Sequence, residues 1–273
     1  DVVPALTETV QASSVFVTKD FGPYGRARDV RVADALRARG SRLRGVGSNY
    51  VAEPGTVVKD DGTSYSVFTP FSRRWLASGI PSPTAAPSEF NWIEQPSDAL
   101  PRHDHTSRLA GVDRWREFRS AGLDDYASQR DLPAVDGTSR LSAALKFGVG
   151  HPRELLDDID ESIDGHRVFR SELAWRDFYA DVLFRYPRSA WENLDTRFDR
   201  LHVDTDAAAR ARFETWCRGA TGFPIVDAGM RQLAATGWMH NRVRMITASF
   251  LVKDLHLPWQ WGARFFMQHL VDG

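Results

Sequence analysis

Residues 221 to 255 read TGFPIVDAGMRQLAATGWMHNRVRMITASFLVKDL, and this stretch decides the fold class of the second half of the chain. Pro224 stands where a helix can begin, and apolar residues follow it at helical spacing until Gly237. A second amphipathic helix is predicted from Asn241 to Leu255, and another from about Gln260. No alternating pattern typical of strands interrupts them, so an all-α assembly is predicted.

Outward from this stretch, helical patterns extend back to about residue 107. Residues 168 to 186 place Phe169, Leu173, Val182 and Leu183 at helical spacing, and Pro187 ends the pattern. Residues 76 to 106 are different, because five prolines stand among Ser and Ala there. Little regular structure survives such a density of proline, so we predict a long interdomain linker.

The first part of the chain has an α/β pattern. Val15 to Thr18 is typical of a buried strand, and a turn is predicted from Asp20 to Gly25. Residues 28 to 39 then predict a helix, and Leu43 to Val46 a second strand, which together form a βαβ unit. We therefore predict an α/β domain over 1–75, a linker over 76–106 and a helical domain over 107–273.

Composition sets limits on the function. The 273 residues carry a formal net charge of −1, so any nucleic-acid site must be a local concentration of arginine. Cys217 is the single cysteine, and no signal peptide or long apolar run is present, which favours a cytoplasmic protein that does not cross a membrane. His240 has no partner at metal-ligand spacing, so no metal site is expected. The chain lacks an initiator Met and stops abruptly at Gly273, so we expect both ends to be cut.

Three clusters of residues carry candidate chemistry. Gly137 to Ser142 precedes a helix predicted to run to about Phe147, and Arg140 adds positive charge to free N–H groups that favour an anion. The alternative is a plain N-cap. Asn241, Arg244 and Met245 share one helical face, which indicates a lined cavity or simply one polar stripe.

The third cluster lies on the helix predicted over residues 168 to 186. Glu172, Trp175, Arg176 and Tyr179 follow one another at helical spacing. A tryptophan flanked by Glu and Arg suits a stacking platform for a nucleic-acid base. The alternative is an exposed Glu–Arg pair, which stabilises a helix by only a few tenths of a kcal/mol.

Read together, these clusters resemble one family. The stretches 137–142, 171–179, 221–228, 237–245 and 248–255 are similar, in order and interval, to the signature stretches of the photolyase/cryptochrome family. The likeness is greatest to the bacterial class I photolyases, light-driven lyases that repair cyclobutane pyrimidine dimers in DNA. It implies a Rossmann-like antenna domain, a linker and an all-α FAD-binding domain.

The resemblance also implies a cofactor site for FAD in its reduced form, FADH⁻. Tyr126 with Thr138, Ser139, Arg140, Leu141 and Ser142 would hold the FAD phosphates, and Phe169 and Arg176 would lie beside the cofactor. Asn241 would face the flavin N5, and Arg244 would pair with Asp272 next to the ring system. Asp20 to Arg28 stands where the family approaches an antenna chromophore, a folate or an 8-hydroxy-5-deazaflavin.

The implied substrate is ultraviolet-damaged DNA containing pyrimidine dimers, bound by a monomer. Arg130 and Arg242 would contact the DNA backbone. Glu172, Trp175, Tyr179 and Met245 would surround a dimer flipped out of the duplex. Glu172, Asn241 and Trp259 would be the catalytic residues, Trp259 as the middle member of an electron-transferring tryptophan chain.

The chain departs from the family pattern in that tryptophan chain. Asp206 stands where the outer tryptophan is expected, and the inner one would lie beyond Gly273. Trp191 is one possible substitute for the outer member. Two other functions stay open: a cryptochrome-type light sensor without repair activity, and an inactive truncated fragment.

Overall fold

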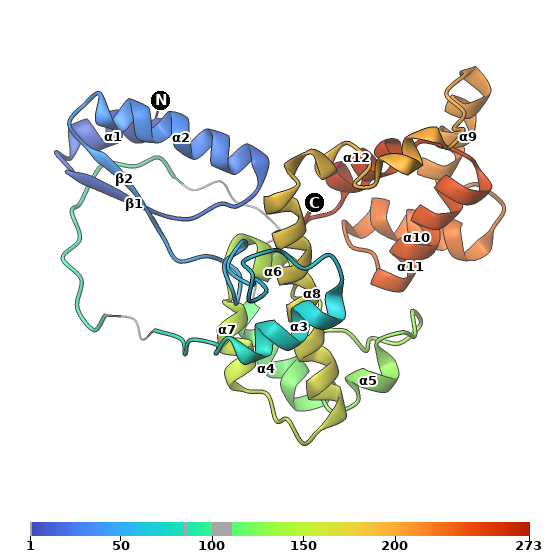
Figure 1. Ribbon diagram of the computed structural model, residues 1–273, viewed down its shortest axis with the longest axis horizontal. Helices are drawn as coiled ribbons and strands as arrows, with labels where there is room; N and C mark the ends of the chain where they lie inside the picture. Colours follow the sequence, from blue (N-terminus) through green and yellow to red (C-terminus); the bar gives the residue numbers. More distant parts are fainter. Residues whose placement is uncertain (1, 85–86, 100–110) are drawn as a thin grey trace. The chain divides into compact units, whose positions relative to one another are not determined.

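The structure is a computed structural model that describes residues 2–84, 87–99 and 111–273. Two compact units divide the chain (Figure 1). The first unit comprises Asp1–Asp124 and Ala144–Pro187, and the second comprises Asp125–Ala143 and Arg188–Gly273. Each unit has its own core, and each is described by itself.

The first unit begins with a parallel strand pair. β1 (Ser14–Thr18) and β2 (Arg42–Val46) pair with Val15 opposite Leu43, and α2 (Pro23–Arg37) joins them (Figure 1). Both predicted strands are confirmed, but the expectation that the first is buried is wrong, because Phe16 in β1 is 64% exposed. The predicted turn from Asp20 to Gly25 is wrong in its second half, because Pro23 occupies the first turn of α2, where a missing N–H costs nothing. A further helix that was not predicted, α1 (Val2–Thr9), packs against α2.

Helices make up the rest of the first unit. The longest is α8 (Asp164–Arg185), which confirms the helix predicted over residues 168 to 186. The others are α3 (Phe68–Ala77), α4 (Gly111–Ala121) and α7 (Pro152–Asp157), while α6 (Ser142–Phe147) crosses the boundary between the units. A core of Val51, Val57, Phe71, Trp75, Ala174 and Phe178 joins α3 and α8 to the loop before α3.

Two buried carboxylates on α8 hold that loop in place. Asp177 accepts hydrogen bonds from the Ala52 N–H at 2.8 Å and from the Trp75 indole N–H at 2.9 Å. One turn later, Asp181 accepts a hydrogen bond from the Gly55 N–H at 2.6 Å. Because a buried N–H without an acceptor costs about 1–3 kcal/mol, these bonds fix the path of the loop against the helix.

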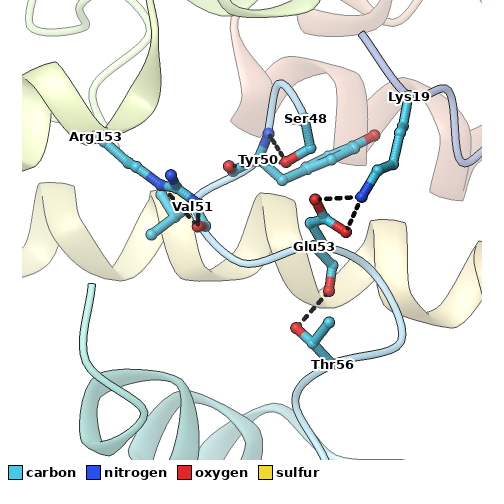
Figure 2. A network of polar contacts seen from close by, with 7 residues as sticks. All are labelled: Lys19, Ser48, Tyr50, Val51, Glu53, Thr56 and Arg153. Carbon is cyan, nitrogen blue, oxygen red and sulfur yellow. Dashed lines mark hydrogen bonds and ion pairs between the residues drawn. The ribbon is translucent and has the colours of Figure 1, made fainter. Parts of the chain in front are cut away.

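The same loop is tied to two further elements (Figure 2). Glu53 receives the Lys19 ammonium at 2.8 Å, which links the loop to the end of β1. The Arg153 guanidinium donates to the Val51 carbonyl at 2.8 and 3.1 Å, which links it to α7. The loop therefore connects the α/β part of the first unit with its helical part.

The second unit is helical throughout its described elements. It contains α5 (Tyr126–Gln129), a 3-10 turn η3 (Thr196–Arg200), α9 (Ala207–Cys217), α10 (Pro224–Thr236), α11 (Asn241–Ser249), a π-helical turn η4 (Phe250–Asp254) and α12 (Trp259–His269). The prediction for Pro224 to Gly237 is confirmed, with Gly237 in the left-handed conformation that ends α10. The helix predicted to run to Leu255 is α-helical only as far as Ser249.

Trp216 lies at the centre of the second unit. Its side chain is fully buried, and its indole N–H donates to the Thr247 carbonyl at 3.1 Å. Met230, Leu233, Met239 and Leu251 complete the surrounding core. The bond satisfies a polar atom that burial would otherwise leave costly.

Outside these units' helices, residues 78–84 and 87–99 contain no helix or strand, in keeping with the proline-rich composition. Part of the predicted linker, residues 85–86 and 100–106, lies outside the described residues. No helix in the described ranges is long and apolar enough to cross a membrane.

Asp177 makes the stability of the first unit depend on pH. Burial raises the pKa of this carboxyl to about 6 from 3.8, against the effect of its hydrogen bonds. The folded state therefore binds a proton more readily than the unfolded chain. The contribution of this group to stability is largest below pH 4, and about 3 kcal/mol of it is lost as the pH rises through 6. Urea unfolding between pH 4 and pH 7 measures this slope. Asp177→Asn should flatten it, and an unchanged slope in the variant would contradict the assignment.

Gly229 allows α10 and α11 to approach closely. A Cβ at this position would lie 2.3 Å from Cγ1 of Val243, so Gly229→Ala should force the helices apart. We expect a loss of about 1–3 kcal/mol in the free energy of unfolding, despite the better helix propensity of alanine. Gly150→Ala is the control, because nothing lies within 4 Å of the added atom there. Equal stability of the two variants would refute the close contact.

Candidate functional site

The segment from Tyr126 to Ser142 forms a loop with close backbone packing. Tyr126 begins α5 with its ring buried, and the Arg130 guanidinium lies 5.5 Å from the ring centroid. A Cβ at Gly137 would lie 2.6 Å from Cβ of Gln129, so the backbone can pass there only as glycine. Thr138 and Ser139 are half-buried, Leu141 is buried and the exposed Ser142 begins α6. The predicted helix to Phe147 is confirmed.

Arg140 has an unusual backbone within this loop. Its φ of 53° lies in the left-handed region, which costs a residue with a side chain about 1–2 kcal/mol. The guanidinium lies 4.6 Å from the centroid of the Trp238 ring and 3.0 Å from the Asp136 carboxylate. The strain places a cation at the start of α6, where backbone N–H groups are also available.

The start of α11 gathers polar side chains. Nδ1 of His240 accepts a hydrogen bond from the Arg242 N–H at 3.1 Å and so caps the helix. Burial is the main cause that lowers the pKa of His240, which keeps the imidazole neutral. The next residue, Asn241, and the half-exposed Met245 lie one turn apart, with the amide nitrogen 3.9 Å from the sulfur.

Arg242 forms a bidentate ion pair. Its Nε and Nη2 donate to the two carboxylate oxygens of Asp131 at 2.7 and 2.8 Å. These bonds from Arg242 are the main cause that lowers the pKa of Asp131. Arg130 lies next to this pair, with its Nε 3.4 Å from the same carboxylate. Two arginines thus share one acidic partner near the start of α11.

Arg244 lies on the buried side of α11. Its Nη2 donates to the Met239 carbonyl at 3.3 Å, while Nε is buried and has no hydrogen-bond partner among the described residues. Burial lowers the pKa of Arg244, and the carboxylate of Asp272 acts in the opposite direction. A buried donor without an acceptor is costly, so this guanidinium suits a ligand that offers carbonyl or phosphate oxygens. FAD carries both, so the residue fits that cofactor.

The predicted stripe on α8 divides into two kinds of residue. Trp175 stacks on Phe68 with ring centroids 3.6 Å apart and on Tyr179 at 5.5 Å, and the Tyr179 ring is 62% exposed. Arg176 instead points inward, where it donates to the Asn49 carbonyl at 2.6 Å and the Leu145 carbonyl at 3.1 Å. The alternative of an exposed Glu172–Arg176 pair is therefore wrong.

One turn or more earlier on α8 lie two other predicted residues. Phe169 is buried and stacks on Trp115, with centroids 5.3 Å apart. Glu172 is half-buried and lies on α8 between Phe169 and Trp175 in sequence. The first unit thus carries Phe169, Glu172, Trp175, Arg176 and Tyr179, and the second carries all other predicted site residues.

Trp259 begins α12 and is fixed by a neighbour. Its indole N–H donates to the side-chain oxygen of Asn193 at 2.9 Å. Asp206, at the position expected for the outer tryptophan, caps α9 by accepting from the Ala209 N–H at 2.7 Å. Trp191 is half-exposed, and its carbonyl accepts from the Gln260 amide at 3.4 Å.

Several residues of the site were missed by sequence reasoning. They are Phe68, which stacks on Trp175, Asp131, which holds Arg242, and Asn193, which holds Trp259. Asp131 follows Arg130 directly, and that adjacency was an available signal. The others lie 107 and 66 residues from their partners, and no local pattern marks them. Among the described residues, no group of three or more His, Cys, Asp or Glu could hold a metal ion.

Two segments of the chain match known protein families. The family described as the FAD binding domain of DNA photolyase matches residues 169–273, and the family described as DNA photolyase matches residues 1–88. The matched ranges include most of α8 and all of α10, α11 and α12 at one end, and the βαβ unit at the other.

Individual relatives agree with this. The whole chain is 37% identical over 309 residues to the deoxyribodipyrimidine photo-lyase of Synechococcus sp., and it spans 62% of that protein's length. A bacterial class III photolyase from Agrobacterium tumefaciens is similar in structure with a TM-score of 0.82 and 32% identity, over 99% of this chain and 61% of that one. A cryptochrome from Synechocystis sp. gives 0.85 and 25%, over 100% and 62%. The chain belongs to the photolyase/cryptochrome family.

Proposed function

We propose that the protein is a light-driven DNA repair enzyme that splits cyclobutane pyrimidine dimers. The observation that carries this proposal is 37% identity, over all of the chain, to a protein named deoxyribodipyrimidine photo-lyase. Since the chain spans about three fifths of that relative, activity and substrate are inferred rather than observed. Within the first unit, the stacked rings of Trp175 and Tyr179 on α8 support the same reaction.

The proposed cofactor is FAD in its reduced form, which supplies on illumination the electron that opens the cyclobutane ring. Tyr126 and Thr138 to Ser142 are the residues that would bind its phosphates. In support of this, the loop offers hydroxyls, the Arg140 cation and the first N–H groups of α6. Phe169 and Arg176 are assigned to the cofactor as well, although Arg176 already donates to two carbonyls.

Asn241, Arg244 and Asp272 are assigned to the flavin ring system. Arg244 supports this assignment most strongly, because its buried Nε is a donor that needs an acceptor. The amide of Asn241 can both donate and accept a hydrogen bond, so it suits a ring nitrogen whose protonation state changes.

The dimer would be bound outside the duplex, because chemistry on a base requires its removal from the stack. Phe68 covers one face of Trp175. The dimer would therefore lie on the side of the indole that adjoins the exposed Tyr179 ring. Glu172 would hydrogen-bond the pyrimidine edge and stabilise charge that develops there. Met245 would provide a polarizable apolar wall.

Arg130 and Arg242 are assigned to the DNA backbone. In the protein alone, the Asp131 carboxylate holds both guanidinium groups in position. The two guanidinium groups are therefore already positioned for a phosphate. Binding a phosphate would cost free energy, because it must compete with the Asp131 carboxylate. We further propose Trp259 as an electron relay. A bacterial class I assignment, a monomeric state and a cytoplasmic location are also proposals.

The chain is proposed to comprise a Rossmann-like antenna domain over residues 1–75, a linker over 76–106 and the FAD-binding domain over 107–273. A cavity of about 380 Å³ lies at the carboxyl ends of β1 and β2, and Lys19, Asp20 and Arg26 contribute to its walls. Ligands of open α/β sheets bind at this edge, so the cavity supports an antenna chromophore, either a folate or a deazaflavin.

Illumination of the flavin-loaded protein with DNA containing thymine dimers tests the repair function. We expect thymine to be recovered in light and not in darkness. Glu172→Gln should retain FAD and lose about 100-fold in repair rate, because it removes a charge aimed at the reacting pyrimidine. The exposed Glu117→Gln on α4 is the control. Flavin binding without thymine recovery in the unaltered protein would favour the cryptochrome alternative.

Arg140→Gly separates cofactor binding from stability. Glycine removes the strain at φ 53°, and this gain offsets the loss of the ion pair with Asp136 and of the contact with the Trp238 ring. The free energy of unfolding should therefore change by no more than about 1 kcal/mol. FAD affinity should fall about tenfold, since a charged hydrogen bond to phosphate is lost. Titration calorimetry with FAD measures this, and Arg140→Lys should retain most of the affinity. Unchanged FAD affinity in the glycine variant would remove Arg140 from the site.

A further inference from the structure

The second unit contains a cavity that shares only Trp259 with the residues proposed for repair. Its volume is about 650 Å³, within the range of sites for small molecules. The walls come from the turn η3, from the π-helical turn η4 and from the start of α12. Apolar side chains form most of the lining, and a few polar groups stand among them.

The backbone around this cavity is held in two costly conformations. In η4 the Leu255 N–H donates to the Phe250 carbonyl, five residues back, at 3.0 Å. Such π-helical turns are rare in proteins, and those that occur often lie at functional sites. His256 follows with a φ of 53°, in the left-handed region. Strain of this kind persists where it is part of a function. Together the two features bring Lys253 and His256 to the cavity wall.

Two aromatic rings in the wall have no ring partner. Trp259 and Phe198 both line the cavity, and neither contacts another aromatic ring within the described ranges. By contrast, Phe213, Trp216 and Phe265 of the same unit pack against one another. The bond from Trp259 to Asn193 fixes the indole plane without covering it. Both rings are therefore available to stack on a planar ligand.

The cavity wall carries one cation, which can pair with an anionic group, and one carboxylate. Lys253 is exposed and has no carboxylate within ion-pair distance among the residues that the structure describes. The acidic residue in the wall, Asp199, already accepts a hydrogen bond from the Asn193 amide at 2.7 Å. An unpaired cation beside two unpartnered rings fits an aromatic ligand that carries one negative group.

We propose that this cavity is a binding site for a small planar aromatic molecule bearing a phosphate or carboxylate, stacked at Trp259 and Phe198 and paired with Lys253. The site shares Trp259 with the proposed electron relay, but binding there requires neither flavin chemistry nor DNA. Trp259 would then sense the ligand directly through its ring.

Fluorine NMR of the protein labelled with 5-fluorotryptophan and saturated with FAD tests the site. The chain has nine tryptophans, and Trp259→Phe assigns the signal of interest. Adenosine 5′-monophosphate is the probe, with adenosine and ribose 5-phosphate as the two halves of its chemistry. We expect the monophosphate to shift the Trp259 signal saturably, adenosine to do so at higher concentration, and ribose 5-phosphate to leave it unmoved.

Charge variants complete the test. Lys253→Gln should weaken the monophosphate about fivefold and leave adenosine unchanged, while Lys253→Arg retains binding. Lys59→Gln, in the first unit, is the matched control and should bind as the unaltered protein does. No saturable shift at Trp259, or equal binding of adenosine and its monophosphate, would overturn the proposal. A shift confined to other tryptophan signals would overturn it as well.

Discussion

The buried carboxylate of Asp177 is the constraint on which the first unit depends. It accepts hydrogen bonds from the loop before α3 and from Trp75 on α3, so a single side chain on α8 joins three segments far apart in sequence. α8 also carries Phe169, Glu172, Trp175 and Tyr179. The position of these candidate site residues relative to α3, including the stack on Phe68, thus depends on one buried carboxyl group.

Helices with strong periodicity were predictable, because their apolar faces repeat along the chain. α8 and α10 began and ended within a few residues of the predicted positions, and Pro187 and Gly237 marked their ends. The start of α2 was misread, because Pro23 was taken as part of a turn rather than as the first turn of the helix. The π-helical turn after Ser249 could not be predicted, because its residues have the same spacing pattern as an ordinary helix.

The candidate site was predictable in its residue types but not in its contacts. Arg176 looked like a surface residue paired with Glu172, yet it is half-buried against two carbonyls and the Tyr50 ring. Such a position depends on Asn49, over a hundred residues away in the chain, and on Leu145. Trp175 was expected to present its ring, but its pairing with Phe68 depends on α3. Local patterns therefore indicated where the chemistry lies, whereas packing decided which atoms are available for it.

The π-helical turn also has a consequence for chain length. A bond that spans five residues instead of four makes the turn equivalent to an ordinary helix with one extra residue. Deleting one residue between Phe250 and Asp254 would leave an ordinary α-helical turn in register with α11. Homologous sequences one residue shorter at this point would keep the helix but lose the wall that Lys253 and His256 form. The length of this segment is therefore a simple marker for the cavity across related sequences.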